Sequence, residues 1–81
     1  MSKIPIDLYY NPDLDCFTLE VGIAAINIDY SREGNEIIIK VPPIVSKIFT
    51  EEGKKWLEEE LIDLAKRKIA YPMEKIVVVF E

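Results

Sequence analysis

Several residue types on which protein chemistry usually depends are missing or rare in this chain. The 81 residues include no histidine, one cysteine, and three glycines that stand far apart. Without histidine, neither a Ser-His-Asp triad nor a Cys-His pair can form. The single cysteine, Cys16, excludes an intramolecular disulfide and cannot supply the several ligands of a zinc site. The isolated glycines do not make a phosphate-binding loop. These absences favour a protein that is not an enzyme and that has no cofactor, no metal and no catalytic residues.

Positive charge and long apolar runs are also scarce. The formal net charge is −5, which disfavours general attraction to nucleic acid or anionic lipid. No apolar run approaches the ~20 residues of a membrane span, and no signal-peptide pattern is visible, so we expect a cytoplasmic protein without membrane association. Glutamine is absent while Ile, Glu and Lys are abundant. This balance is typical of hyperthermophiles and predicts a thermophilic source.

The chain is nevertheless rich in apolar residues, and its length fits one domain covering residues 1–81. Apolar and polar side chains alternate over residues 4–10, which predicts a strand. The sequence NPDLD at 11–15 is rich in turn formers and predicts a hairpin loop. Alternation resumes over 16–30, but its phase changes midway. Such a change indicates a bulge, a bend, or two faces buried in succession within one long strand.

A second hairpin turn is predicted at 31–36, where Gly34 or Asn35 can take a positive φ. A third strand follows at 37–41, and two prolines end it. Residues 42–49 have no clear periodicity, so we interpret them as a linker that packs apolar side chains.

A long helix is predicted after Thr50, whose side chain suits the N-cap position. Its apolar residues recur at spacings of three and four, and Tyr71-Pro72 ends it after about 19 residues. A last strand runs from Lys75 to Glu81. The order is β-β-β-α-β, which predicts an α+β fold with a four-stranded sheet. The first three strands form an antiparallel meander, the C-terminal strand lies parallel at an edge beside strand one or three, and the helix packs on one face.

The strands at 37–41 and 75–81 carry consecutive apolar residues, so apolar side chains point to both faces of the sheet. One helix covers one face of about two strands. Burying one Ile or Val contributes about 1.5–3 kcal/mol, so several left in water would cancel the stability of so small a domain. We therefore expect a homodimer or a tight complex with another protein, unless residues 42–49 fold over the second face. The interface candidates are Ile76, Val77, Val78, Val79, Phe80 and Trp56.

The acidic residues of the first hairpin are the candidates for a cation or acid–base site. Asp13 and Asp15 lack the repeated ligands and the glycine of a calcium loop, and Asp is also common in turns for local reasons. A solvated turn is the first interpretation. A weak cation site and catalysis shared with a partner subunit are the alternatives.

The leading functional hypothesis is a small interaction or dimerisation module. The alternative is a nucleic-acid-binding protein with one lysine-rich face and exposed tyrosines, because net charge averages over faces. A charge-patterned surface explains the same lysines without any ligand. The nucleic-acid candidates are Lys40, Lys47, Lys54, Lys55 and Tyr9.

Overall fold

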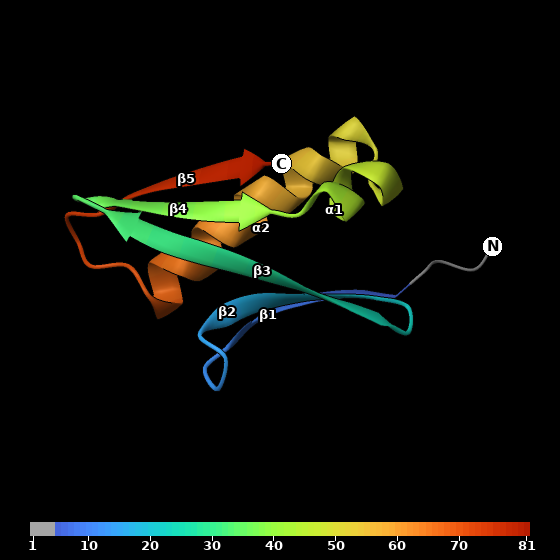
Figure 1. Cartoon of the computed structure of the whole chain (residues 1–81), viewed down its shortest axis with the longest axis horizontal. Coiled ribbons are helices and arrows are strands. Elements are labelled where there is room, and N and C mark those ends of the chain that lie inside the picture. The colour runs from blue at the N-terminus through green and yellow to red at the C-terminus, as the bar shows by residue number, and fades with distance from the viewer. Residues whose placement is uncertain (1–4) are drawn as a thin grey trace.

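The computed structural model of the chain describes residues 5–81 and shows an α+β fold with one mixed sheet of five strands (Figure 1). Ile4, the first residue of the first predicted strand, lies outside the described residues. The strands follow one another in the order β1-β2-β3-β4-β5, with β1 to β4 antiparallel and β5 parallel to β4. The elements are β1 (Ile6–Asn11), β2 (Cys16–Val21), β3 (Ala24–Glu33), β4 (Glu36–Val41), α1 (Pro43–Ile48), α2 (Glu51–Lys68) and β5 (Lys75–Phe80).

The prediction of one long strand over residues 16–30, and with it a four-stranded sheet, was wrong. A tight turn at Gly22 and Ile23 divides this segment into β2 and β3. Gly22 has φ 61°, and Ile23 does not have a positive φ, the pattern of a type II′ hairpin turn. The turn places Val21 opposite Ala24. The phase change in the sequence therefore marks a chain reversal and not a bulge.

The linker predicted for residues 42–49 is also wrong, because this segment forms the short helix α1. Its first residue is Pro43, a position where a missing N–H costs nothing. Val45 is fully buried in the same core that α2 covers. The segment therefore does not fold over the opposite face of the sheet.

The long helix and the last strand are confirmed. Thr50 Oγ1 accepts a hydrogen bond of 3.0 Å from the backbone N–H of Gly53 and so caps α2. The predicted turn at Gly34 is confirmed by its φ of 61°. As expected, β5 lies parallel to the strand that precedes the helices.

The two halves of β3 pair with different neighbours. Residues 24–28 pair with β2, and residues 29–33 pair with β4. The β1–β2 hairpin and the β4–β5 pair are therefore staggered along β3, with α2 on one side of the sheet (Figure 1). The core lies between α2 and this side. It consists of Phe17, Leu19, Ile28, Ile37, Ile39, Val41, Val45, Leu57, Leu61, Leu64 and Ala65. We call the opposite side of the sheet the outer face.

Candidate functional site

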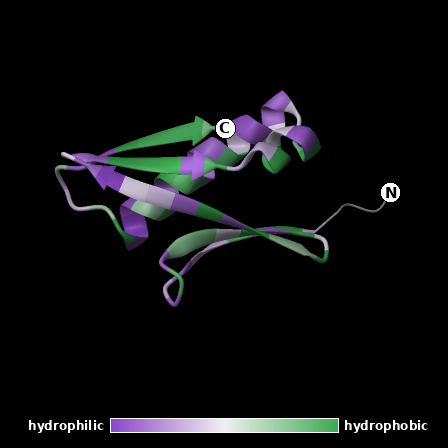
Figure 2. Cartoon of the chain, in the orientation of Figure 1, coloured by the Kyte–Doolittle hydropathy of each residue, from purple (hydrophilic) through white to green (hydrophobic). Residues whose placement is uncertain are grey.

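The fifth strand, where most interface candidates lie, forms one edge of the sheet. Ile76, Val78 and Phe80 point toward α2 and are partly buried. Val77 and Val79 point to the outer face and are 36% and 41% exposed. Figure 2 shows β5 as a hydrophobic strand at the rim of the molecule.

Among residues 5–81, no strand pairs with the outer side of β5. Lys75 N–H donates to Asn35 O at 2.8 Å, and Glu81 N–H donates to Val41 O at 2.9 Å. Because backbone groups of alternate strand residues point to opposite sides, the odd-numbered residues of β5 bond to β4. The N–H and C=O groups of Ile76, Val78 and Phe80 therefore face away from the sheet. Such an edge is a template for pairing with another strand.

The opposite edge of the sheet, β1, is less suited to pairing. Pro5 precedes the strand and Pro12 follows it, and proline cannot donate to a ladder. The side chains that β1 presents on the outer face are Asp7, Tyr9 and Asn11, all polar or amphipathic. Of the two edges, β5 is the one that exposes valines.

On the outer face, Val77 and Val79 continue into the middle of the sheet. Ile38 lies opposite Val77 in the register and is half-buried. Lys40 lies opposite Val79, and Ser31 lies opposite Ile38. The apolar strip on this face is thus narrow and borders the β5 edge, so the rest of the outer face does not need a cover.

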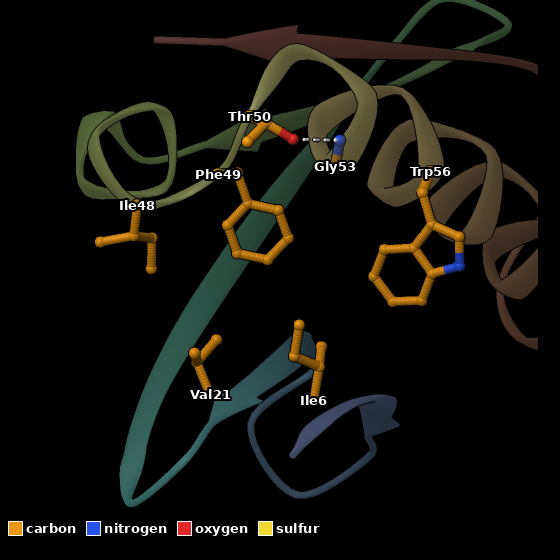
Figure 3. Close-up of a pocket in the computed structure, with 7 residues that line it drawn as sticks. All are labelled: Ile6, Val21, Ile48, Phe49, Thr50, Gly53 and Trp56. Carbon is orange, nitrogen blue, oxygen red and sulfur yellow. Dashed lines mark hydrogen bonds between the residues drawn. The ribbon is translucent and has the colours of Figure 1, made fainter. Parts of the chain in front are cut away.

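A second surface is an open groove between the β1–β2 hairpin and the start of α2. We call it the apolar groove. It has a volume of about 390 Å³, and its lining residues are Ile6, Val21, Ile48, Phe49, Thr50, Gly53 and Trp56. Figure 3 shows Ile6 and Val21 on one side of it and Phe49 and Trp56 on the other. Trp56, the remaining interface candidate, is 42% exposed here.

A close contact between Phe49 and Gly53 shapes the groove. A Cβ added at Gly53 would lie 3.0 Å from Cδ2 of Phe49. The absence of a side chain at position 53 lets the aromatic ring pack against the first turn of α2. The hydroxyl of Thr50 already accepts the capping hydrogen bond from Gly53, so the groove offers mainly apolar contacts to a ligand or partner.

Sequence reasoning found Trp56 and missed the other groove residues. The spacing of Ile44 and Ile48, both about half exposed, is that of one helix face, and recognising it would have placed α1. No sequence signal predicts that Ile6 and Val21, neighbours in the first hairpin, face this helix start across a gap.

Asp15, one of the two candidate carboxylates, accepts hydrogen bonds from two tyrosines. Its Oδ1 accepts hydrogen bonds from the hydroxyls of Tyr10 at 2.5 Å and Tyr30 at 2.7 Å. These bonds lower the pKa of Asp15, and the bond from Tyr10 to Asp15 raises the pKa of that tyrosine to about 12. The buried ring of Phe17 lies 5.8 and 5.9 Å from the two tyrosine rings. Asp13 is exposed in the turn.

Arg32 extends this arrangement to the C-terminal end of α2. Its Nε donates to Glu74 at 2.9 Å, and its guanidinium lies over the rings of Tyr30 and Tyr71. It also donates to the carbonyl of Ile69, just after α2. A backbone bond from Tyr71 and then Arg32 lower the pKa of Glu74. The polar cluster, as we name it, consists of Tyr10, Asp15, Tyr30, Arg32, Tyr71 and Glu74. Its bonds are internal, which is the pattern of a structural link.

The nucleic-acid candidates are divided between the two sides of the sheet. Lys40 and Tyr9 point to the outer face, where the Tyr9 hydroxyl donates to Glu20. Lys54, on α2, pairs with Glu51 at 3.0 Å and lies over the ring of Phe80. Lys47 and Lys55 are exposed on α1 and α2. The structure does not bring these residues onto one face.

Among residues 5–81, no three His, Cys, Asp or Glu side chains are grouped closely enough to hold a metal ion. Within the same range, no helix is long and apolar enough to cross a membrane. Comparison of the chain with protein-family models, with curated proteins and with solved structures gave no match.

Proposed function

We propose that the chain is a protein-interaction module that assembles through the edge of β5. The observation that carries the proposal is an unpaired strand edge with valines exposed beside it. Free N–H and C=O groups at Ile76, Val78 and Phe80 offer hydrogen bonds, and Val77 and Val79 offer apolar area. Backbone pairing with flanking apolar contacts is a common means of protein recognition.

The apolar groove supports the same class of function. None of its lining side chains titrates, and its single hydroxyl is used within the chain. An open apolar surface of this kind favours contact with apolar groups over proton transfer. The cytoplasmic location and the thermophilic source stay predictions from composition.

Sedimentation equilibrium tests the proposal. The purified chain at micromolar concentration is expected to have a mass above the 9.4 kDa of one copy. Replacing Val77 and Val79 with lysine should shift the mass toward one copy, because charge at an edge opposes pairing. A matched control places lysine at the exposed Ile44 of α1 and should leave the mass unchanged. A wild-type chain that stays at 9.4 kDa with no added partner at every concentration overturns self-assembly.

A further inference from the structure

The chemistry along the β5 edge identifies its partner, given the proposed function on which this step depends. We infer that the partner is a second copy of the chain, and that the two β5 strands pair antiparallel about a two-fold axis at Val78. The result is one continuous sheet across both copies.

The first support is the backbone. Ile76, Val78 and Phe80 present their N–H and C=O groups to the free side. In an antiparallel pair, residues that exchange both hydrogen bonds lie opposite each other. With the axis at Val78, outward-facing residues meet outward-facing residues along the whole strand. The facing pairs are Val78 with Val78, Ile76 with Phe80, Val77 with Val79 and Lys75 with Glu81.

The second support is charge. Lys75 and Glu81 stand at the two ends of an apolar run. In this register each lysine lies opposite the glutamate of the second copy, in the closely spaced pair class where side chains interact. Moving the axis to Val77 or Val79 removes both pairs and shortens the overlap. The strand is therefore complementary to itself in charge only when it is centred on Val78.

The third support is shape. Beside Phe80, the surface between β5 and α2 is hollowed, with Glu51, Lys54, Lys55 and Glu58 around it. Lys54 Nζ lies 5.7 Å from the centre of the Phe80 ring. The register brings Ile76 of the second copy to this ring. On the outer face it joins Val77 and Val79 of both copies into one apolar strip.

A charge-exchange experiment tests the register. In homodimers of Lys75→Glu, and likewise of Glu81→Lys, like charges face each other at both ends of the strand. Each variant alone should dimerise on the order of 10-fold more weakly than wild type at low salt. An equal mixture of the two variants forms a heterodimer in which both facing pairs are opposite in charge. The mixture should recover wild-type affinity, measured by sedimentation equilibrium.

Cross-linking provides a second readout in a Cys16→Ala background. Val77→Cys and Val79→Cys chains, mixed, should form a disulfide rapidly because facing residues of this pair class lie about 4.5 Å apart. Either variant alone should cross-link slowly, because identical positions are displaced along the strand by two residues. A dimer that shows neither recovery in the mixture nor selective cross-linking overturns the register while the proposed function stands. A wild-type chain that stays monomeric overturns both the register and the second copy as the partner.

Discussion

The two ends of α2 meet the sheet in opposite ways. At the C-terminal end, the polar cluster joins the first hairpin, β3 and the α2–β5 connection through Asp15, Arg32 and Glu74. At the N-terminal end, the apolar groove leaves Ile6 and Val21 separated from Phe49 and Trp56. At one end, the β1–β2 hairpin is therefore linked to the end of α2 through the polar cluster. At the other end, an open gap separates the hairpin from α2.

This difference shows where the chain has completed its own packing. Arginine and glutamate in the polar cluster find partners within the chain, and the side chain of Glu74 is only 8% exposed. Within the described part of the chain the groove is left open, and Ile6 and Ile48 remain 48% and 50% exposed. The polar groups of the cluster are thus paired within the chain, whereas apolar side chains of the groove are left exposed.

The largest expected effect on the free energy of unfolding comes from replacing a phenylalanine with alanine, tested once at each end of α2. Phe17→Ala removes a fully buried ring beneath the polar cluster and should cost about 3–5 kcal/mol, close to the whole stability of a domain this size. Phe49→Ala removes a half-buried ring beside the groove and should cost about 1–2 kcal/mol. Urea unfolding followed by circular dichroism measures both free energies. Equal losses would contradict the contrast between the two ends.

Of the two ends of α2, titration should affect the cluster end and not the groove end, whose lining side chains do not titrate. The pKa values of Asp15 and Glu74 lie below their ordinary 3.8 and 4.5, so the folded state holds these carboxylates ionised where the unfolded chain takes up protons. Stability is therefore full above this range and falls as the pH drops through it. The pKa of Tyr10 lies near 12, above the ordinary 10.0, so stability also falls as the pH rises between these values.

The measurement is the free energy of unfolding as a function of pH. Asp15→Asn should make the acid limb of this profile shallower and leave the part due to Glu74. Tyr10→Phe should make the alkaline limb shallower and leave the part due to Tyr9 and Tyr30, whose pKa values are also raised. Trp56→Leu, in the groove, should change neither limb because no groove side chain titrates. A wild-type profile retained in Asp15→Asn would show that the acid dependence arises elsewhere.

A smaller effect is expected at Gly53. Alanine favours a helix by up to about 1 kcal/mol over glycine, but its Cβ would lie 3.0 Å from the Phe49 ring. The ring borders an open groove, so it can move and relieve the contact. Gly53→Ala should therefore change stability by less than about 0.5 kcal/mol. A loss above 2 kcal/mol would mean that Phe49 is fixed and that the groove is rigid.

The smallest effect concerns the single tryptophan. Trp56 is 42% exposed and lines the apolar groove. It does not line the depression beside Phe80. Its fluorescence should be quenched by acrylamide to the same extent at low and high protein concentration, because pairing through β5 leaves the groove open. Protection that grows with concentration would place the groove inside the assembly.

The sequence predicted those parts of the fold that depend on local signals. Thr50 as a cap, Pro72 as a helix end and Gly34 in a turn were each readable from one residue and its neighbours. The reversal at Gly22 was missed, although a two-residue loop places odd-numbered residues opposite even-numbered ones. The shift from Phe17 and Leu19 to Ile26 and Ile28 was that signature, and it was interpreted as a bulge, a bend or two faces buried in succession within one strand.

The site was predictable only in part, for a geometric reason. The β5 candidates follow from an apolar run at the end of the chain, and their alternation between α2 and the outer face follows from strand geometry. The groove and the polar cluster join segments that are distant in sequence, such as Arg32 with Glu74. Such pairs depend on how the β1–β2 hairpin is placed against α2, which no local pattern specifies.

The divided pairing of β3 has a consequence for how the molecule opens. The first five residues of β3 pair with β2, and its last five pair with β4. Within the described residues, the two halves of the sheet are therefore joined by the β3 chain itself and by no backbone hydrogen bonds between them. Backbone amides of β1 and β2 can therefore exchange with solvent hydrogen in local openings that leave β4 and β5 protected. A proline introduced at Asp29, where the halves meet, would remove a backbone donor from the strand that both halves share and should make these local openings more frequent.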